Sequence, residues 1–330
     1  MGTAMSFGTP NFGGYLFRKG VEKTPFSTMI GARRGITNHV KFVTGQYYNS
    51  VKGSQPNISE AASLTAPEAN VATRSQLFNV TQIFQETVSV SYAKEANMGT
   101  MAPVGGDTAA VASGIAGQMP NPQSELEFQI ERAMAKIAQD IEYTFINGQF
   151  NEATNDNEVN KSRGILTAIT TNTINAGGDG MTRKLISKAL MAISEAGGDI
   201  SNIVVGMPAI HLAQLDYDSQ KNGMTAVVRN NEINGIKVQT ILTPFGAVGV
   251  QLMETIPVGT ALVFDPTIMQ PMEQPTPGKG NFFLEELAKT GAGHNYQIFG
   301  QIGLDHGPEW LSAKITGLSE DFPEDPVVSG

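Results

Sequence analysis

Two periods of apolar and polar residues run along this chain, and they separate the expected strands from the expected helices. Residues 78–92 alternate at every second position, most strictly at Val88 and Val90, as a half-buried strand does. Residues 36–42 alternate in the same way. A segment rich in Ser, Asn, Pro and Ala, residues 49–73, lies between them. The pattern therefore predicts a protruding hairpin with a long polar tip.

The helical period is clearest in residues 125–146, where apolar residues recur three and four positions apart. Ser124 and Glu127 form a capping box before this run, and Gly148 can end it. At 1.5 Å per residue the predicted helix would be roughly 33 Å long. Its exposed face is expected to carry Arg132, Lys136 and Asp140.

The second half of the chain mixes shorter elements. A helix is expected over residues 183–196, ended by Gly197 and Gly198. Residues 296–304 and 310–315 alternate on either side of a turn and predict a hairpin of two long strands. Further strands are expected at residues 203–205, 236–242, 248–253 and 261–264, with a short helix at 209–215. The fold class is therefore α+β.

Two segments follow neither period. Residues 1–37 are punctuated by Gly and Pro around the aromatic residues Phe12, Tyr15 and Phe17, which predicts an extended arm. Such an arm cannot bury its aromatic residues alone, so it must lie on its own body or on a neighbour. Residues 98–119, rich in Gly and Ala, are interpreted as a flexible connector.

The composition indicates a large uncharged surface. Charged residues make up 16% of the 330 residues, below the share of roughly one quarter that is usual in soluble domains. Because charge is expensive to desolvate, interface centres are depleted of it. The composition therefore suits a chain that buries its exterior against copies of itself, with a weakly charged monomer as the alternative.

Charge and cysteine content exclude several functions. A net charge of −9, without a cluster of basic residues, argues against direct binding of a phosphate backbone. The absence of cysteine removes disulfides, thiolate nucleophiles and cysteine-ligated zinc. No window approaches the ~20 apolar residues of a membrane span. Since no leader pattern precedes the arm, we expect the protein to be cytosolic where it is made.

Motifs for catalysis or ligand binding are incomplete. Lys279 is followed by Gly280 where a phosphate-binding loop needs Ser or Thr. The four histidines, His39, His211, His294 and His306, are too scattered for a metal motif. Asp156, Glu158 and Asn160 alternate as calcium ligands do, but Lys161 replaces the required Gly, which favours a solvated loop. We predict no catalytic, cofactor or metal site.

The order of arm, long hairpin, long helix, α+β region and terminal strands resembles the Hong Kong 97 fold of tailed-bacteriophage major capsid proteins. Residues 79–84, followed by residues 88–91, are similar to a run that precedes the spine helix in one group of phage major head proteins. Residues 140–142, with Asn147 and Gly148, are similar to the end of that helix.

The resemblance implies a division of the chain into parts named as in that fold. Residues 1–36 would be the N-arm and residues 37–93 the E-loop, which reaches over a neighbouring subunit. Residues 94–164 would hold the connector and the spine helix of the peripheral domain. Residues 165–258 would be the axial domain, and residues 259–330 would supply peripheral-domain strands and the C-terminal segment.

The resemblance also implies the function. It predicts a major capsid protein, not an enzyme, that self-assembles into hexamers and pentamers of an icosahedral phage head enclosing double-stranded DNA. Expected partners are copies of itself, a portal, a separate scaffolding protein, with decoration proteins as a further option. DNA would be enclosed without sequence-specific binding, and no membrane is involved. The subunit would be made in the host bacterial cytoplasm and end in the virion.

Three alternatives remain at this point. One is an encapsulin-type compartment shell of the same fold, and another is a hydrolase with a site that is invisible in the sequence, using His211 and Asp216. A phage tail or fibre component, which would form rods or rings, is the third. On the capsid hypothesis, Lys52 is the one Lys near the hairpin tip that could form a covalent cross-link. The predicted subunit-interface residues are Phe12, Tyr15, Phe17, Arg33, Arg34, Lys52, Arg74, Asn79, Gln82, Arg132, Lys136 and Lys279.

Overall fold

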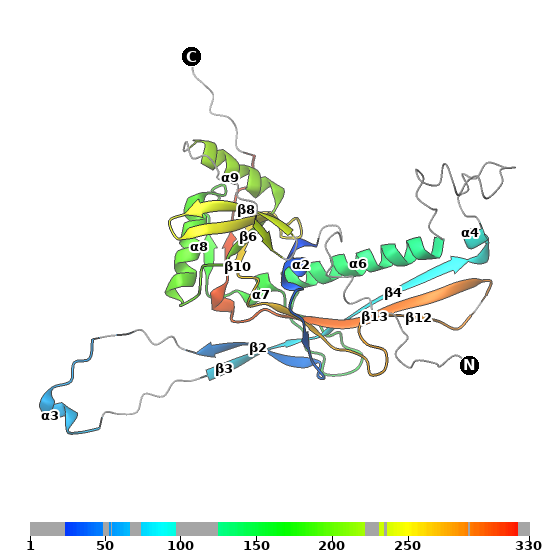
Figure 1. The fold of residues 1–330 in the computed structure, drawn as a ribbon, viewed down its shortest axis with the longest axis horizontal. Coiled ribbons are helices and arrows are strands. Elements are labelled where there is room, and N and C mark those ends of the chain that lie inside the picture. The colour runs from blue at the N-terminus through cyan, green and yellow to red at the C-terminus, as the bar shows by residue number, and fades with distance from the viewer. Residues whose placement is uncertain are drawn as a thin grey trace, which may run out of the picture.

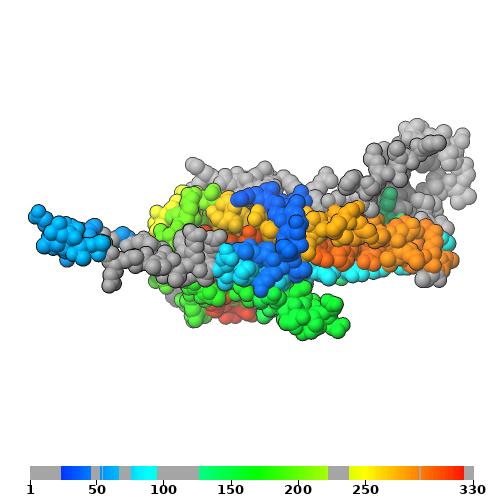
Figure 2. All heavy atoms as spheres, turned by 90° about the horizontal axis from the view of Figure 1, so that it is seen from below, coloured from blue at the N-terminus to red at the C-terminus, as the bar shows by residue number. Residues whose placement is uncertain are grey.

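The fold is that of a computed structural model, which describes residues 24–48, 53, 55–66, 74–96, 125–221, 231–233, 236–289 and 291–322. Figure 1 shows an elongated subunit with a thin hairpin extending to one side and a long helix lying along strands on the other. In the edge-on view of Figure 2, the hairpin tip stands well apart from the body.

The long sheet is built around one strand, β13 (Gly293–Asp305). It pairs with β4 (Gln82–Ser91) over ten antiparallel residue pairs. On its other edge it pairs with β12 (Phe283–Glu286) and β11 (Gln270–Glu273), and β11 in turn pairs with β1 (Gly35–Ile36). These strands give the helix beside them a flat surface to pack on.

That helix is α6 (Glu125–Asn147), and it confirms the helix predicted for residues 125–146. Its apolar stripe is buried at Ile137, Ile141 and Phe145, where α2 (Pro25–Ile30) and α7 (Ile165–Ala168) pack against it. The predicted cap at Ser124 lies outside the described residues. The helix ends before Gly148, as predicted.

A second sheet of seven strands holds a separate core under α8 (Arg183–Glu195) and α9 (Ala209–Lys221). The helix α8 confirms its prediction, whereas α9 continues six residues beyond the predicted end at residue 215. The strands run in the order β5 (Thr173–Asn175), β14 (Ala313–Thr316), β10 (Thr260–Phe264), β6 (Val204–Met207), β9 (Gly246–Leu252), β8 (Ile236–Thr243) and β7 (Asn231–Ile233).

The hairpin consists of β2 (Lys41–Tyr48) and β3 (Arg74–Val80), which pair only with each other, and the segment between them. A short helix, α3 (Glu60–Ser63), lies near its tip. The helix α4 (Tyr92–Ala96) follows β4. Residues 41–80 are called the hairpin from here on, and residues 55–66 its tip.

Three sequence predictions of strands were wrong in their bounds or in their pairing. Residues 36–42 are not one strand, because the Thr37 hydroxyl accepts a hydrogen bond from the His39 amide (3.1 Å) and forms a turn between β1 and β2. Residues 78–92 divide at Thr81, and β4 pairs with β13, so the hairpin ends at Val80 instead of near residue 93.

The predicted terminal hairpin was also wrong, because β13 and β14 belong to different sheets. Between them the chain forms a 3-10 turn, η2 (Glu309–Leu311). The Glu309 carboxylate accepts hydrogen bonds from the amides of Thr170 (2.9 Å) and Thr171 (3.1 Å). These bonds hold the turn beside the segment that leads into β5 of the seven-stranded sheet. As a result β14 joins the seven-stranded sheet, and residues 259–330 contribute strands to both sheets.

Candidate assembly interface

The hairpin base has one face turned to the body and one turned outward. Phe42 and Thr44 are buried, whereas Val43 and Phe78, which face each other across the two strands, are 45% and 39% exposed. The Lys41 ammonium lies 4.9 Å from the centre of the Phe78 ring. A two-stranded sheet with one open face is only marginally stable by itself. The outer face is therefore a candidate contact surface.

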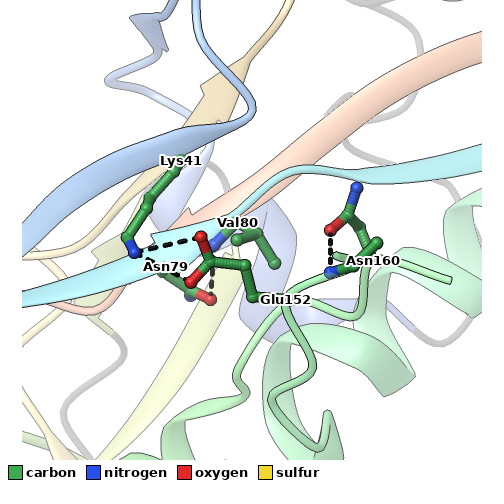
Figure 3. A network of polar contacts seen from close by, with 6 residues as sticks. Lys41, Asn79, Val80, Glu152 and Asn160 are labelled. Atoms are coloured by element: carbon green, nitrogen blue, oxygen red, sulfur yellow. Dashed lines mark hydrogen bonds and ion pairs between the residues drawn. The ribbon is translucent and has the colours of Figure 1, made fainter. Parts of the chain in front are cut away.

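Polar contacts fasten the hairpin base to the loop that follows α6. Figure 3 shows the Lys41 ammonium reaching the Glu152 carboxylate, at 2.8 Å from Oε2, and the nearby Asn79 side chain. The Asn79 amide donates hydrogen bonds to the carbonyls of Leu304 (2.7 Å) and Arg163 (3.1 Å). Its Oδ1 accepts one from the Arg163 amide (2.7 Å).

These bonds place one predicted interface residue inside the subunit. Asn79 is fully buried, and its side-chain donors and acceptor are used within the chain. Its side chain therefore acts as an internal clamp between β3, the loop after α6 and β13. Nothing in the sequence separates a clamp Asn from an exposed one.

The base also contains a sharply bent point at Gly45. The register of β2 and β3 shifts between Thr44 and Gln46, and Gly45 has a φ of +54°. A Cβ atom there would lie 2.6 Å from the Gly307 carbonyl oxygen. Thr44 holds the bulge from the side, since its hydroxyl donates to Asp305 Oδ1 (2.8 Å). The hairpin is thus set at a defined angle to the body.

The hairpin tip has no core of its own. Every residue from 55 to 66 is exposed, including Ile58 at 63% and Leu64 at 87%. Ser59 caps the single turn of α3, with its hydroxyl accepting the Ala62 amide (3.2 Å). Two large apolar side chains therefore lie exposed on one short turn, which makes the tip a second candidate contact surface.

A buried carboxylate joins α6 to the segment where the predicted arm meets the body. Glu142 is fully buried and accepts hydrogen bonds from the amides of Phe26 (2.9 Å) and Ser27 (2.7 Å) at the start of α2. Burial raises the pKa of Glu142 to about 7, although the bonds from Ser27 and Phe26 act in the opposite direction. Glu142 was not among the predicted site residues.

The other predicted interface residues are spread over the subunit. Arg33 donates to the Thr267 carbonyl (2.6 Å), Arg34 pairs with Glu273 (3.3 Å), and Lys279 pairs with Glu285 (2.8 Å). On α6, Lys136 pairs with Glu86 and Asp140, and Arg132 lies over the Phe128 ring. Gln82 accepts a hydrogen bond from the Ser162 amide. Phe12, Tyr15, Phe17 and Lys52 lie outside the described residues, as does the side chain of Arg74.

The hydrolase alternative is not supported by the surroundings of His211. This side chain is fully buried, with Nδ1 against Gln214 Oε1 (2.9 Å) and Nε2 accepting the Gly259 amide (2.9 Å). Both ring nitrogens are therefore occupied, and Asp216 Oδ2 instead accepts a hydrogen bond from Gln220 (2.8 Å). The pair is not brought together as a nucleophile-activating unit.

The loop that alternates like a calcium site is held by its own hydrogen bonds. The Glu158 carboxylate accepts from Thr154 and Asn155, and Asn160 Oδ1 accepts from the Ala153 amide (2.8 Å). Within the described residues no group of three His, Cys, Asp or Glu side chains could hold a metal ion. In the same part of the chain, no helix combines the length and apolar character needed to cross a membrane.

Comparisons with known proteins agree on the fold. Residues 1–319 match the family model described as SU10 major capsid protein. The holo-SrpI encapsulin of Synechococcus elongatus is 9% identical, with 94% of each chain covered and a TM-score of 0.60. The capsid of cyanophage A-1(L) is also 9% identical, covering 90% of this chain and 93% of the other, with a TM-score of 0.60.

A further solved structure, the procapsid of satellite phage P4, is 11% identical, with 95% of this chain and 93% of the other covered and a TM-score of 0.52. The search of curated protein sequences finds no match. At these identities the solved structures establish the fold, which is the Hong Kong 97-like capsid fold expected from the sequence.

Proposed function

Because the chain belongs to the SU10 major capsid protein family, we propose that it forms the hexamers and pentamers of an icosahedral phage head that encloses double-stranded DNA. Membership of that family makes the chain a structural protein of a viral capsid that is assembled from many copies of itself. We propose the icosahedral symmetry, the enclosed DNA and the contacts between copies in addition to what family membership gives.

The exposed hairpin tip is the observation that carries this proposal. Ile58 and Leu64 expose most of their surface on a turn that touches no core. Val43 and Phe78 leave the outer face of the base open as well. In an assembly, the neighbouring copy covers both surfaces, and many modest contacts add up through valency. Here the hairpin acts as the E-loop of the fold.

The polar candidates fit the rim of such a contact. Arg33, Arg34, Arg132, Lys136 and Lys279 are charged, and the partners they have inside the subunit leave them at the surface, where rim contacts are polar and solvent-accessible. Gln82, Arg74 and Lys52 are proposed for the same rim. The aromatic residues Phe12, Tyr15 and Phe17 of the N-arm would add apolar contacts.

The remaining partners follow from the same account. A net charge of −9 suits a wall that surrounds DNA without gripping it. We propose no catalytic activity, no cofactor and no membrane partner. A separate scaffolding protein, a portal and decoration proteins would act during head assembly in the host cytoplasm. The loop between β11 and β12 would meet other capsomers at threefold positions.

An encapsulin-type shell is the second candidate, because the encapsulin and the cyanophage capsid give the same TM-score of 0.60. The fold therefore does not separate the two, whereas the family match favours the phage capsid. The contents of particles purified from infected cells discriminate between them. Nuclease-protected DNA supports the phage head, and a stoichiometric cargo protein without nucleic acid supports the encapsulin.

Electron microscopy of the expressed protein, alone and together with the products of neighbouring genes, tests the proposal directly. We expect closed shells of uniform diameter with six-fold and five-fold capsomers. Rods, open rings, or a subunit that stays single at high concentration under all of these conditions would contradict it.

A further inference from the structure

The hairpin tip needs a receptor on another copy, and the cavities of the body differ in how well they suit it. The tip offers Ile58 and Leu64 as apolar anchors, with the carboxylate of Glu60 between them. A fitting receptor combines an apolar wall with a cation that lacks a partner of its own. One cavity of about 600 Å³, between the hairpin base and the end of α7, has this combination.

The cation of this cavity is Arg163. Its guanidinium lies over the Phe150 ring, 4.5 Å from the ring centre, where a cation is attracted to the aromatic face. Both backbone polar groups of Arg163 are bonded to Asn79, so the residue cannot easily shift. Among the described residues no carboxylate and no hydrogen-bond acceptor pairs with this guanidinium. Burial lowers the pKa of Arg163, but a guanidinium stays protonated in proteins, so the cavity keeps its positive charge.

The residues that line the cavity do not neutralise the Arg163 guanidinium, so it can pair with a carboxylate of another copy. Trp310 and Leu77 line the cavity beside Phe150 and provide apolar surface. Glu309 also lines it, but its carboxylate is held by the amides of Thr170 and Thr171 and by the Thr171 hydroxyl. The acid is therefore satisfied locally and does not compete for the guanidinium.

The other cavities suit a carboxylate less well than the Arg163 cavity, whose one acid, Glu309, accepts three hydrogen bonds. The groove between α6 and β4 also contains a cation, Lys161, but its two acids, Glu86 and Asp140, share the ammonium of Lys136 and would compete for Lys161. The apolar groove under α9 contains Asp216, and the hollow beside the C-terminal segment contains Asp179 and Asp218. Like charges at a contact cost binding energy, so an acidic tip is rejected at these places.

We propose that the hairpin tip of one copy docks in the Arg163 cavity at the hairpin base of the next copy. Glu60 then pairs with Arg163, and Ile58 and Leu64 pack on Trp310 and Phe150. This inference rests on the proposed function, since it specifies the receptor of the E-loop.

The contact is heterologous, tip to base, and such a contact repeated around an axis closes a ring. The fifteen steps along the chain from Gly45 to Glu60 can span at most about 50 Å, which sets the upper limit of the reach. Each copy uses its tip once and its cavity once, so the same contact serves five or six subunits.

Disulfide trapping tests the inference cleanly, because the chain contains no cysteine. Leu64→Cys is combined with Thr167→Cys, which places a thiol on the exposed rim of the cavity. We expect a ladder of linked subunits on a non-reducing gel after mild oxidation of assembled particles. As the matched control, Leu64→Cys with Val159→Cys places the second thiol in a different cavity and should give no ladder.

Two outcomes of this experiment remain distinct. Particles that assemble but give no ladder with the cavity pair, or the same ladder with the control pair, overturn the tip-to-base contact and leave the capsid function intact. Failure of the unmodified chain to form particles under any condition instead overturns the proposed function.

Charge reversal gives a second, independent test. Glu60→Arg should raise the subunit concentration needed for assembly about tenfold or more, because it places two cations together. Adding Arg163→Glu should recover most of this loss. Glu320→Arg serves as the control, because this acid lies beside the exposed Phe322 of the C-terminal segment, a rival occupant. A tenfold effect of Glu320→Arg with none from Glu60→Arg overturns the proposal in favour of that segment.

Discussion

The hairpin and the seven-stranded sheet use apolar residues alike, but only the sheet finds its core within the chain. All four residues of β6 are buried, and residues 261–264 of β10 are entirely shielded. In the hairpin, Phe42 and Thr44 are buried while their neighbours Val43 and Phe78 remain open. On the proposed function, this difference separates the stability of the subunit, which comes from the body, from its assembly, which uses the hairpin.

The largest effect on stability should come from creating a cavity in the core of the body. Phe145 on α6 is fully buried, so Phe145→Ala should lower the free energy of unfolding of the subunit by about 3–5 kcal/mol. Denaturant titration measures the change. Phe128→Ala, on the exposed face of the same helix, should cost less than about 1 kcal/mol. Equal losses at the two positions would contradict the assignment of the core.

The buried Glu142 makes the stability of the body depend on pH. Its pKa rises from 4.5 to about 7 on folding, so the folded subunit keeps a proton that the unfolded chain releases. Stability should therefore fall as the pH rises between these two values, by up to about 3 kcal/mol, and level off above pH 7.

The variant Glu142→Gln checks this prediction, because an amide does not titrate. Unfolding midpoints of the variant should vary less between pH 4.5 and 7 than those of the original chain. The variant leaves one of the two amides of α2 without a full acceptor, so some stability is lost at every pH. An unchanged pH profile would show that another group controls it.

The substitution Gly45→Ala at the hairpin base should lower the free energy of unfolding of the subunit by an intermediate amount. The new methyl group would meet the Gly307 carbonyl at a backbone angle that Ala rarely adopts. We expect a loss of about 1–3 kcal/mol, measured by thermal unfolding. Gly53→Ala is the control within the same hairpin, because no atom lies within 4 Å of the added carbon. If both changes are harmless, the base is not fixed as described.

The smallest effect on stability should come with a large effect on assembly. Replacing Ile58 and Leu64 by Ser should change the free energy of unfolding of the single subunit by less than about 0.5 kcal/mol, since both are exposed. Shell yield, measured by sedimentation, should fall sharply. Met191→Ser, an exposed apolar position on α8, is the control and should leave assembly intact. Shells that form normally from the tip variant would refute the role of the tip.

The sequence predicts local elements well where one period and one stop signal agree. The helices α6 and α8 follow from apolar spacing and from Gly148 and Gly197, which depend only on neighbouring residues. The pairing of β4 does not follow, because alternation predicts a strand without naming its partner, and β13 lies some two hundred residues away in the chain.

Of the candidate site, the exposed aliphatic residues of the tip could have been noticed as isolated apolar residues in a polar segment. The Arg163 cavity could not, because Phe150 and Arg163 meet only after Asn151 and Lys161 pair across the loop. The internal bonds of Asn79 were not predictable for a related reason. Its burial depends on Leu304, which a distant strand supplies.

Hydrogen–deuterium exchange of residues 55–66 tests the central claim most directly. In unassembled subunits the amides of this segment should exchange quickly, because the single exposed turn of α3 gives them little protection. In assembled shells they should be strongly protected. Protection that is already complete in single subunits, or that remains absent in closed shells, would show that the hairpin does not find its missing core on an adjacent copy.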